Sequence, residues 1–115
     1  MEIITETIAL STLKSKYMNF FPDMIKADVD TEKRVLAVDA ELHADLETLL
    51  LDNGSLQENI WGINIYPANS PDECIEFTSL INIRPSQNNF SMEVEDEDTK
   101  QKITEIVKGL IDFES

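Results

Sequence analysis

The stretch MIKADVDTEKRVLAVDA, residues 24–40, decides the fold of this chain. Its first part, residues 24–30, alternates between apolar and polar side chains, which is typical of a strand with one buried face. Residues 34–40 are apolar on both faces and therefore predict a strand inside the sheet. Residues 30–33 favour a turn, so the two strands should form a hairpin. The apolar row of the first strand is Ile25, Ala27 and Val29, with Lys26 and Asp28 on the opposite face.

The segments around this hairpin show both periodicities. Apolar residues at helical spacing predict helices over residues 8–21 and 41–52, the first stopped by Pro22. Alternation predicts further strands over residues 60–66, 74–84 and 90–94, and a last helix follows Asp96 or Asp98 as its N-cap. A short helical turn is also expected after Ser55, which has capping-box spacing to Glu58.

The expected architecture is a single α+β domain over residues 1–115, with the order α-ββ-α-βββ-α. Short turns join the strands, so we expect a mostly antiparallel sheet of four to five strands. The helices are predicted to pack on one face of this sheet. The other face would then be free for water or a partner.

The charge is the outstanding global feature of the sequence. Twenty-three acidic residues face nine basic ones, which gives a formal net charge of −14. Such a chain repels phosphates, so we expect no nucleic acid and no membrane among its partners. The general interpretation of this acidity is solubility or an organism with an acidic proteome. The more specific interpretations are a cation site, a basic protein partner or mimicry of nucleic acid.

The remaining composition points to the cytoplasm and to no cofactor. The one cysteine, Cys74, has no partner for an internal disulfide and is interpreted as a small apolar residue in a reducing compartment. The N-terminus lacks the basic and apolar regions of a secretory signal. Three glycines leave no phosphate-binding loop.

The junction between the second strand and the following helix carries one candidate site. His43 and Glu47 are four residues apart on one helical face, and Asp39 precedes them. One imidazole with carboxylates, Glu41 included, suits Mn, Fe or Zn, or a general base. The alternative interpretation is a solvated histidine, with carboxylates that favour the helix N-terminus.

A second candidate site lies on the polar face of the later strands. Asn64 and Tyr66 on one strand and Asn82 and Arg84 on the next fall opposite the isoleucine rows. If these strands pair, Arg84 would bind a carboxylate or phosphate with two hydrogen bonds. The alternatives are a structural ion pair for Arg84 and backbone hydrogen bonds for the asparagines.

Four motifs carry a resemblance to a known family. They are ELHADLE within residues 41–47, GSLQ at residues 54–57, WGINIYP at residues 61–67 and SLINIRP at residues 79–85. In this order they resemble a family of small uncharacterised prokaryotic proteins, a domain of unknown function. The similarity covers the chain from about Met24 to the last helix. It implies a free-standing domain and no assigned activity or catalytic residues.

The function is not evident from the sequence, and two hypotheses follow. The first is a non-enzymatic binding or interaction module that acts on a protein partner or as a homo-oligomer. The second is a small metal-binding protein or enzyme that uses Asp39, Glu41, His43 and Glu47, with Arg84 binding an anionic group.

Overall fold

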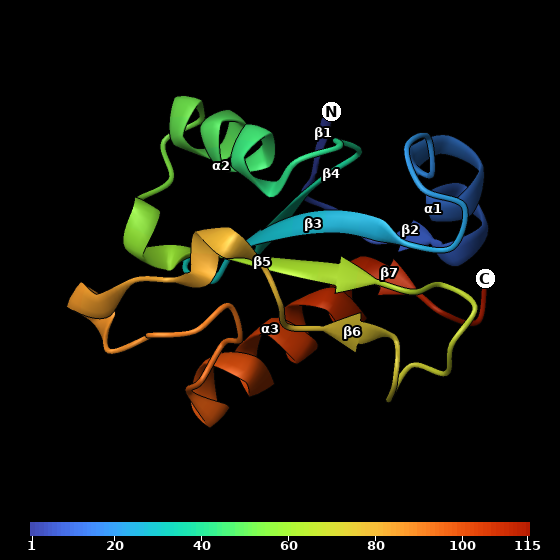
Figure 1. The fold of residues 1–115 in the computed structure, drawn as a ribbon. Coiled ribbons are helices and arrows are strands. Elements are labelled where there is room, and N and C mark those ends of the chain that lie inside the picture. Colours follow the sequence, from blue (N-terminus) through green and yellow to red (C-terminus); the bar gives the residue numbers. More distant parts are fainter.

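A computed structural model describes all residues, 1–115, and shows an α+β protein built on an antiparallel sheet (Figure 1). Five strands form this sheet in the order β1-β4-β3-β5-β6. The strands are β1 (Glu2–Ile4), β2 (Ile8–Ala9), β3 (Ile25–Asp30), β4 (Val35–Val38), β5 (Ile60–Ile65), β6 (Ile75–Glu76) and β7 (Ile111–Asp112). The helices are α1 (Leu10–Tyr17), α2 (His43–Asp52) and α3 (Glu97–Leu110), with 3₁₀ turns η1 (Gln57–Asn59), η2 (Leu80–Asn82) and η3 (Pro85–Gln87).

The predicted hairpin forms the centre of the sheet. β3 and β4 pair antiparallel, β3 is the middle strand, and β4 lies between β3 and β1. The apolar residues on both faces of β4 are explained by this interior position, because each face packs against a separate core cluster. The class and the mostly antiparallel sheet of five strands are therefore as predicted.

The helices lie on both faces of the sheet, and the prediction of a single covered face was wrong. Ala27 and Val29 of β3 pack with residues of α1 and α3 in the larger cluster. Ala37 of β4, on the opposite face, packs with Leu46 and Leu50 of α2. Figure 1 shows α2 above the sheet and α3 below it. The apolar side chains at helical spacing in α2 are enough to cover this face.

Both ends of the chain contain short strands that the sequence did not indicate. β1 pairs antiparallel with β4, and β2 pairs parallel with β7. Because Ile8 and Ala9 belong to β2, the first helix is shorter than the predicted 8–21 and ends before Pro22 at Tyr17. The last helix is capped as predicted, since the Asp96 side chain accepts a hydrogen bond from the Thr99 amide. None of the helices has the length and apolar character needed to span a membrane.

The strand predicted over residues 74–84 is limited to β6, and the strand predicted over residues 90–94 does not form. Only β6 pairs with β5, at Asn64 and Ile65, and the chain then leaves the sheet to form η2 and η3. The reason lies in Asn82, whose fully buried amide accepts from the Gly62 N–H and donates to the Gly62 carbonyl. This side chain replaces a neighbouring strand at Gly62, so no continuous backbone ladder forms there.

Gly62 permits this close approach. A Cβ atom at this position would lie 2.6 Å from the Ser79 Cβ and 2.7 Å from the Ser79 Oγ. We expect Gly62→Ala to lower the free energy of unfolding by about 1–3 kcal/mol, because the η2 segment has to move away from β5. Gly109→Ala is the matched control, since a Cβ there meets no atom within 4 Å. Urea unfolding should show Gly109→Ala unchanged or more stable, and equal effects of the two variants would contradict the argument.

Candidate functional site

A row of polar side chains crosses the face of the sheet that is covered by α2 and by residues 79–82, here called the η2 segment. Lys26 and Asp28 of β3 lie on this face, and in the strand register they are opposite Asn64 and Gly62 of β5. The glycine leaves room above the strand for the η2 segment. This row is therefore enclosed between the sheet, the first turns of α2 and residues 79–82.

Asp28 is the most unusual residue of the row. Its side chain is 0 % exposed, and neither carboxyl oxygen has a hydrogen-bond partner. Burial raises the pKa of Asp28 well above its ordinary value, and the charge of Glu47 raises it further, whereas Arg84 opposes the shift. Burial therefore favours the protonated, neutral carboxyl more strongly here than at an exposed aspartate, because an enclosed charge loses its hydration.

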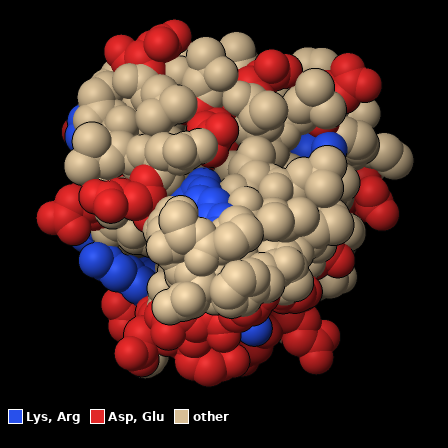
Figure 2. Space-filling view, turned by 60° about the vertical axis from the view of Figure 1, so that its left-hand side comes forward, with Lys and Arg blue, Asp and Glu red and all other residues tan.

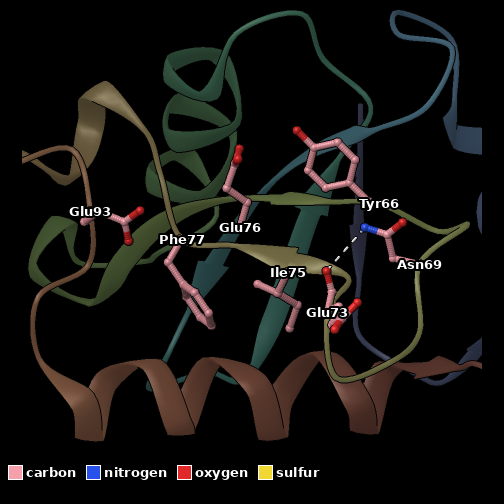
Figure 3. Close-up of a pocket in the computed structure, with 7 residues that line it drawn as sticks. All are labelled: Tyr66, Asn69, Glu73, Ile75, Glu76, Phe77 and Glu93. Carbon is pink, nitrogen blue, oxygen red and sulfur yellow. Dashed lines mark hydrogen bonds between the residues drawn. The ribbon is translucent and has the colours of Figure 1, made fainter.

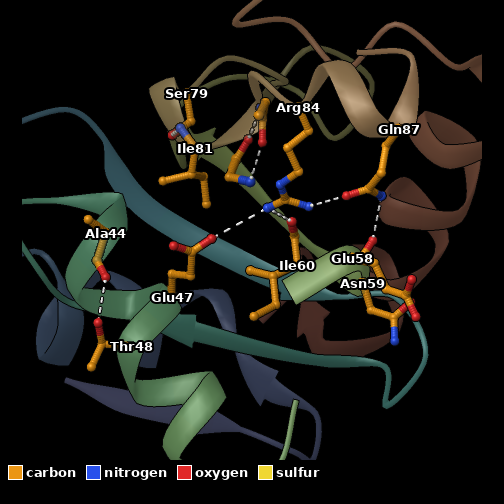
Figure 4. A network of polar contacts seen from close by, with 12 residues as sticks. Ala44, Glu47, Thr48, Glu58, Asn59, Ile60, Ser79, Ile81, Arg84 and Gln87 are labelled. Carbon is orange, nitrogen blue, oxygen red and sulfur yellow. Dashed lines mark hydrogen bonds and ion pairs between the residues drawn. The ribbon is translucent and has the colours of Figure 1, made fainter. Parts of the chain in front are cut away.

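Arg84 belongs to the same enclosed region (Figure 4). Its guanidinium donates to the Ile60 carbonyl and forms an ion pair with Glu47 of α2 at 3.4 Å. It also lies 4.9 Å from the centroid of the Trp61 ring. Only 8 % of the Arg84 side chain is exposed. Arg84 therefore forms the structural ion pair that was the alternative prediction for it. This pair connects the chain between η2 and η3 to α2.

The three residues considered for a metal do not come together. The Asp39 carboxylate accepts from the Asn19 amide at 2.9 Å, Glu47 pairs with Arg84, and His43 Nε2 lies 2.8 Å from the Ile63 carbonyl. Glu41 and Asp39 line one pocket of the surface, and neither His43 nor Glu47 belongs to its lining. No group of three or more histidine, cysteine, aspartate or glutamate side chains in the structure is placed to hold a metal ion.

The contact with Ile63 determines the tautomer of His43. A carbonyl only accepts, so Nε2 carries the hydrogen, and Nδ1 is the unprotonated nitrogen of the neutral ring. Burial lowers the pKa of His43, the nearby Lys26 charge lowers it as well, and the hydrogen bonds to the Ile63 carbonyl and the Asn64 side chain oppose both. His43 is therefore neutral at pH 7 and adds no positive charge to its surroundings.

A pocket of about 430 Å³ opens above this row, between the N-terminus of α2 and the η2 segment. It brings together two sequence-predicted site residues, His43 and Asn64, from the two different candidate sites. Lys26 is the only charged residue in its wall. The lining residues are Lys26, Leu42, His43, Ala44, Asn64, Thr78, Ser79, Leu80, Ile81 and Met92.

The absence of carboxylates distinguishes this pocket from the others. Each of four other pockets is lined by at least one aspartate or glutamate. Figure 2 shows the side that carries residues 80–92, with a broad central area poor in acidic side chains and a dense acidic band below it. In a protein of net charge −14, the pocket is thus a local exception to the acidic surface.

The remaining predicted ligand-binding residues lie elsewhere. Asn82 and Arg84 are enclosed as described, and Tyr66 lines a depression at the sheet edge beside β6 (Figure 3). There, Ile75 and Phe77 point toward α3, whereas Tyr66 and Glu76 point to the opposite side. Glu76 and Glu73 add charge to this edge strand, which discourages pairing with another chain.

Sequence reasoning missed Lys26 and Asp28 as site residues. Their alternation with Ile25, Ala27 and Val29 places them on the polar face of β3, which was predicted to be free for water or a partner. The signal was present in residues 34–40, because a neighbouring strand that is apolar on both faces implies that both faces are covered. A covered face makes an aspartate at its centre exceptional.

These features define a small antiparallel α+β protein with one carboxylate-free pocket over the central strands. A family model described as "Protein of unknown function (DUF5674)" matches residues 2–110, and the chain belongs to this family. The match extends further toward the N-terminus than the predicted resemblance from Met24. Comparisons with curated proteins and with solved structures gave no match.

Asp28→Asn is expected to raise the free energy of unfolding at pH 7. The native state binds the Asp28 proton more readily than the unfolded chain does, because the native pKa is raised. Asp28 therefore causes a loss of stability as the pH rises from about 4, the ordinary carboxyl pKa, through the native value. Asparagine does not ionise, so the variant avoids this loss.

Urea unfolding at pH 4 and pH 7 measures this effect as the difference between the variant and the wild-type protein. The difference should be small at pH 4 and should grow at pH 7. Asp23→Asn is the control, because Asp23 is exposed and precedes the same strand. A difference for Asp28→Asn that stays constant between the two pH values would contradict the enclosed, neutral carboxyl.

Proposed function

We propose that this protein is a binding module and that the pocket between α2 and the η2 segment is its binding site. The carrying observation is the combination of an apolar wall and the absence of carboxylates in an otherwise acidic protein. Leu42, Leu80 and Met92 line the pocket and are exposed to solvent. Apolar pockets with a few fixed polar groups are the usual form of ligand sites.

The exposed apolar residues extend beyond the pocket. Ile83 and Phe90 are also exposed, and they belong to the same segment as Leu80 and Met92. Several large apolar side chains exposed on one segment are a feature of interaction sites in soluble proteins. It supports a binding role, whether the ligand is part of a protein partner or a separate small molecule.

The enclosed charges support binding more than catalysis. Asp28 has no exposed surface, and Glu47 and Arg84 are occupied with each other. A catalytic group has to come within hydrogen-bond reach of its substrate. We therefore interpret Asp28, Glu47 and Arg84 as the framework under the binding site.

The proposed setting is the cytoplasm of a prokaryote. Cys74 is a free thiol, and it is buried beneath the loop before β6. Its burial raises the pKa of the thiol, which keeps it in the unreactive protonated form. A lone free cysteine fits a reducing compartment.

Binding of Nile red, a neutral apolar dye, tests the proposed site. We expect saturable fluorescence enhancement with the wild-type protein and a loss of about tenfold in affinity for Leu80→Asp, since burying a leucine side chain contributes about 1.5–3 kcal/mol. Leu56→Asp is the matched control, because Leu56 is 60 % exposed, Leu80 is 72 % exposed, and only Leu80 lines the pocket.

Two outcomes would count against the binding module. Equal affinities of the dye for Leu80→Asp and Leu56→Asp would show that the dye does not use the pocket. Light scattering that shows a wild-type dimer and a Leu80→Asp monomer would show instead that a second copy of the chain covers this face. Thermal melting of both variants checks that they are folded.

A further inference from the structure

The pocket between α2 and the η2 segment adjoins the depression beside β6. Asn64 and Thr78 line the pocket, and each donates a hydrogen bond to a carboxylate that lines the depression. Asn64 Nδ2 donates to Glu76 Oε1 at 2.7 Å, and Thr78 Oγ1 donates to Glu93 Oε1 at 2.9 Å. The pocket of about 430 Å³ and the depression of about 480 Å³ therefore share one wall, and only the depression contains carboxylates.

The depression contains three exposed carboxylates and no basic residue. The carboxylates are those of Glu73, Glu76 and Glu93. None of them takes part in the three ion pairs of the molecule. The ammonium of Lys26 lies over the Phe21 ring at 5.2 Å, and the ammonium of Lys100 pairs with Glu97. The depression therefore favours a cationic group on its occupant.

Two of these carboxylates lie beside the pocket. Figure 3 shows the Glu76 side chain on the face of β6 opposite to α3, and the Glu93 side chain directed toward β6. The pocket lies on the same face of the sheet as Glu76, because α2 and the η2 segment form its walls. An occupant of both would therefore place an apolar group next to Leu80 and a cation next to Glu76 and Glu93.

The size of the surface favours a chain segment over a small molecule. The pocket and the depression each have the volume of an ordinary small-molecule site. Beyond them, Ile83 and Phe90 add exposed apolar surface on the same segment as Leu80. A chain can place separate side chains in the pocket and in the depression and still cover Phe90.

We propose that the pocket and the depression together bind a segment of a partner protein in which apolar residues are flanked by arginine or lysine. An apolar side chain of this segment packs against Leu42, Leu80 and Met92. Its basic side chains pair with Glu76 and Glu93, for which guanidinium has the matching geometry. This inference rests on the proposed function, because it names the partner of the same pocket.

The net charge of −14 is complementary to the same partner. It attracts basic segments over a distance and speeds their encounter with the protein. This attraction acts on any basic chain, so the selection of one depends on the apolar side chain that the pocket accepts. An acidic segment or a nucleic acid would instead meet repulsion from the carboxylates of the depression.

A hexapeptide with two central leucines, two arginines on either side and blocked ends is the first probe. Titrations followed by ¹H–¹⁵N NMR, at about 150 mM salt to screen the net charge, should shift the amide signals of Glu76, Leu80 and Glu93. A second peptide carries citrulline, the neutral isostere of arginine, and should bind about tenfold more weakly. A third peptide with serines in place of the leucines should bind at least about threefold more weakly.

The double variant Glu76→Gln/Glu93→Gln tests the assignment of the charges. Glutamine keeps an acceptor for the neighbouring side chains and removes both negative charges, so the preference for arginine over citrulline should fall about fivefold. Glu32→Gln/Glu114→Gln is the matched control, because it changes the net charge equally and both residues are exposed and line neither the pocket nor the depression. This control should keep most of the preference.

Three results would overturn the inference. They are equal binding of the arginine and citrulline peptides, equal binding of the leucine and serine peptides, and an equal loss of preference in the two double variants. Thermal melting checks that both variants are folded. If Nile red binds in a Leu80-dependent manner while the arginine and citrulline peptides bind equally, the binding module stands and the basic partner is wrong.

Discussion

The side-chain amide of Asn82 forms hydrogen bonds with the backbone N–H and carbonyl of Gly62, and this pairing holds the η2 turn against β5. One side chain satisfies the N–H and the carbonyl of an interior strand residue, at distances of 2.8 and 2.9 Å. It thereby ends the sheet at this point without a further strand, and it fixes η2 directly above the glycine. The pocket wall at Leu80 and the buried position of Arg84 both follow, because they belong to the segment that Asn82 anchors.

The segment that Asn82 anchors and α2 together enclose the charged groups of Arg84, Glu47 and Asp28, and only some of their polar atoms have a partner. Arg84 has one partner in Glu47 and another in the Ile60 carbonyl, while its Nε and both oxygens of Asp28 have none. An unpaired buried charge is costly, and protonation of Asp28 reduces the cost by leaving one cation and one anion in the region. The site above it therefore rests on a framework in which burial favours the protonated form of Asp28.

The hairpin of β3 and β4, the class of fold and the cap at Asp96 were predictable because each depends on local periodicity or on a local hydrogen bond. The strand over residues 74–84 was not, because its apolar residues alternate correctly and only the long-range contact of Asn82 with Gly62 prevents pairing. The residues of the candidate site were likewise predictable only in part. His43 and Asn64 were identified separately from residue type, and only the tertiary fold brings them into one pocket with Lys26.

The distribution of charge connects the fold with the proposed site. Part of the acidity is used at element ends, as at Asp96, where the carboxylate accepts from the first turn of α3. Much of the remainder surrounds the other pockets, where it repels anions. The pocket between α2 and η2 differs from these, because its only charged lining residue is Lys26, so an anion meets less repulsion there. In this view the acidic surface contributes to selectivity, since it surrounds the other pockets with carboxylates and leaves this one without them.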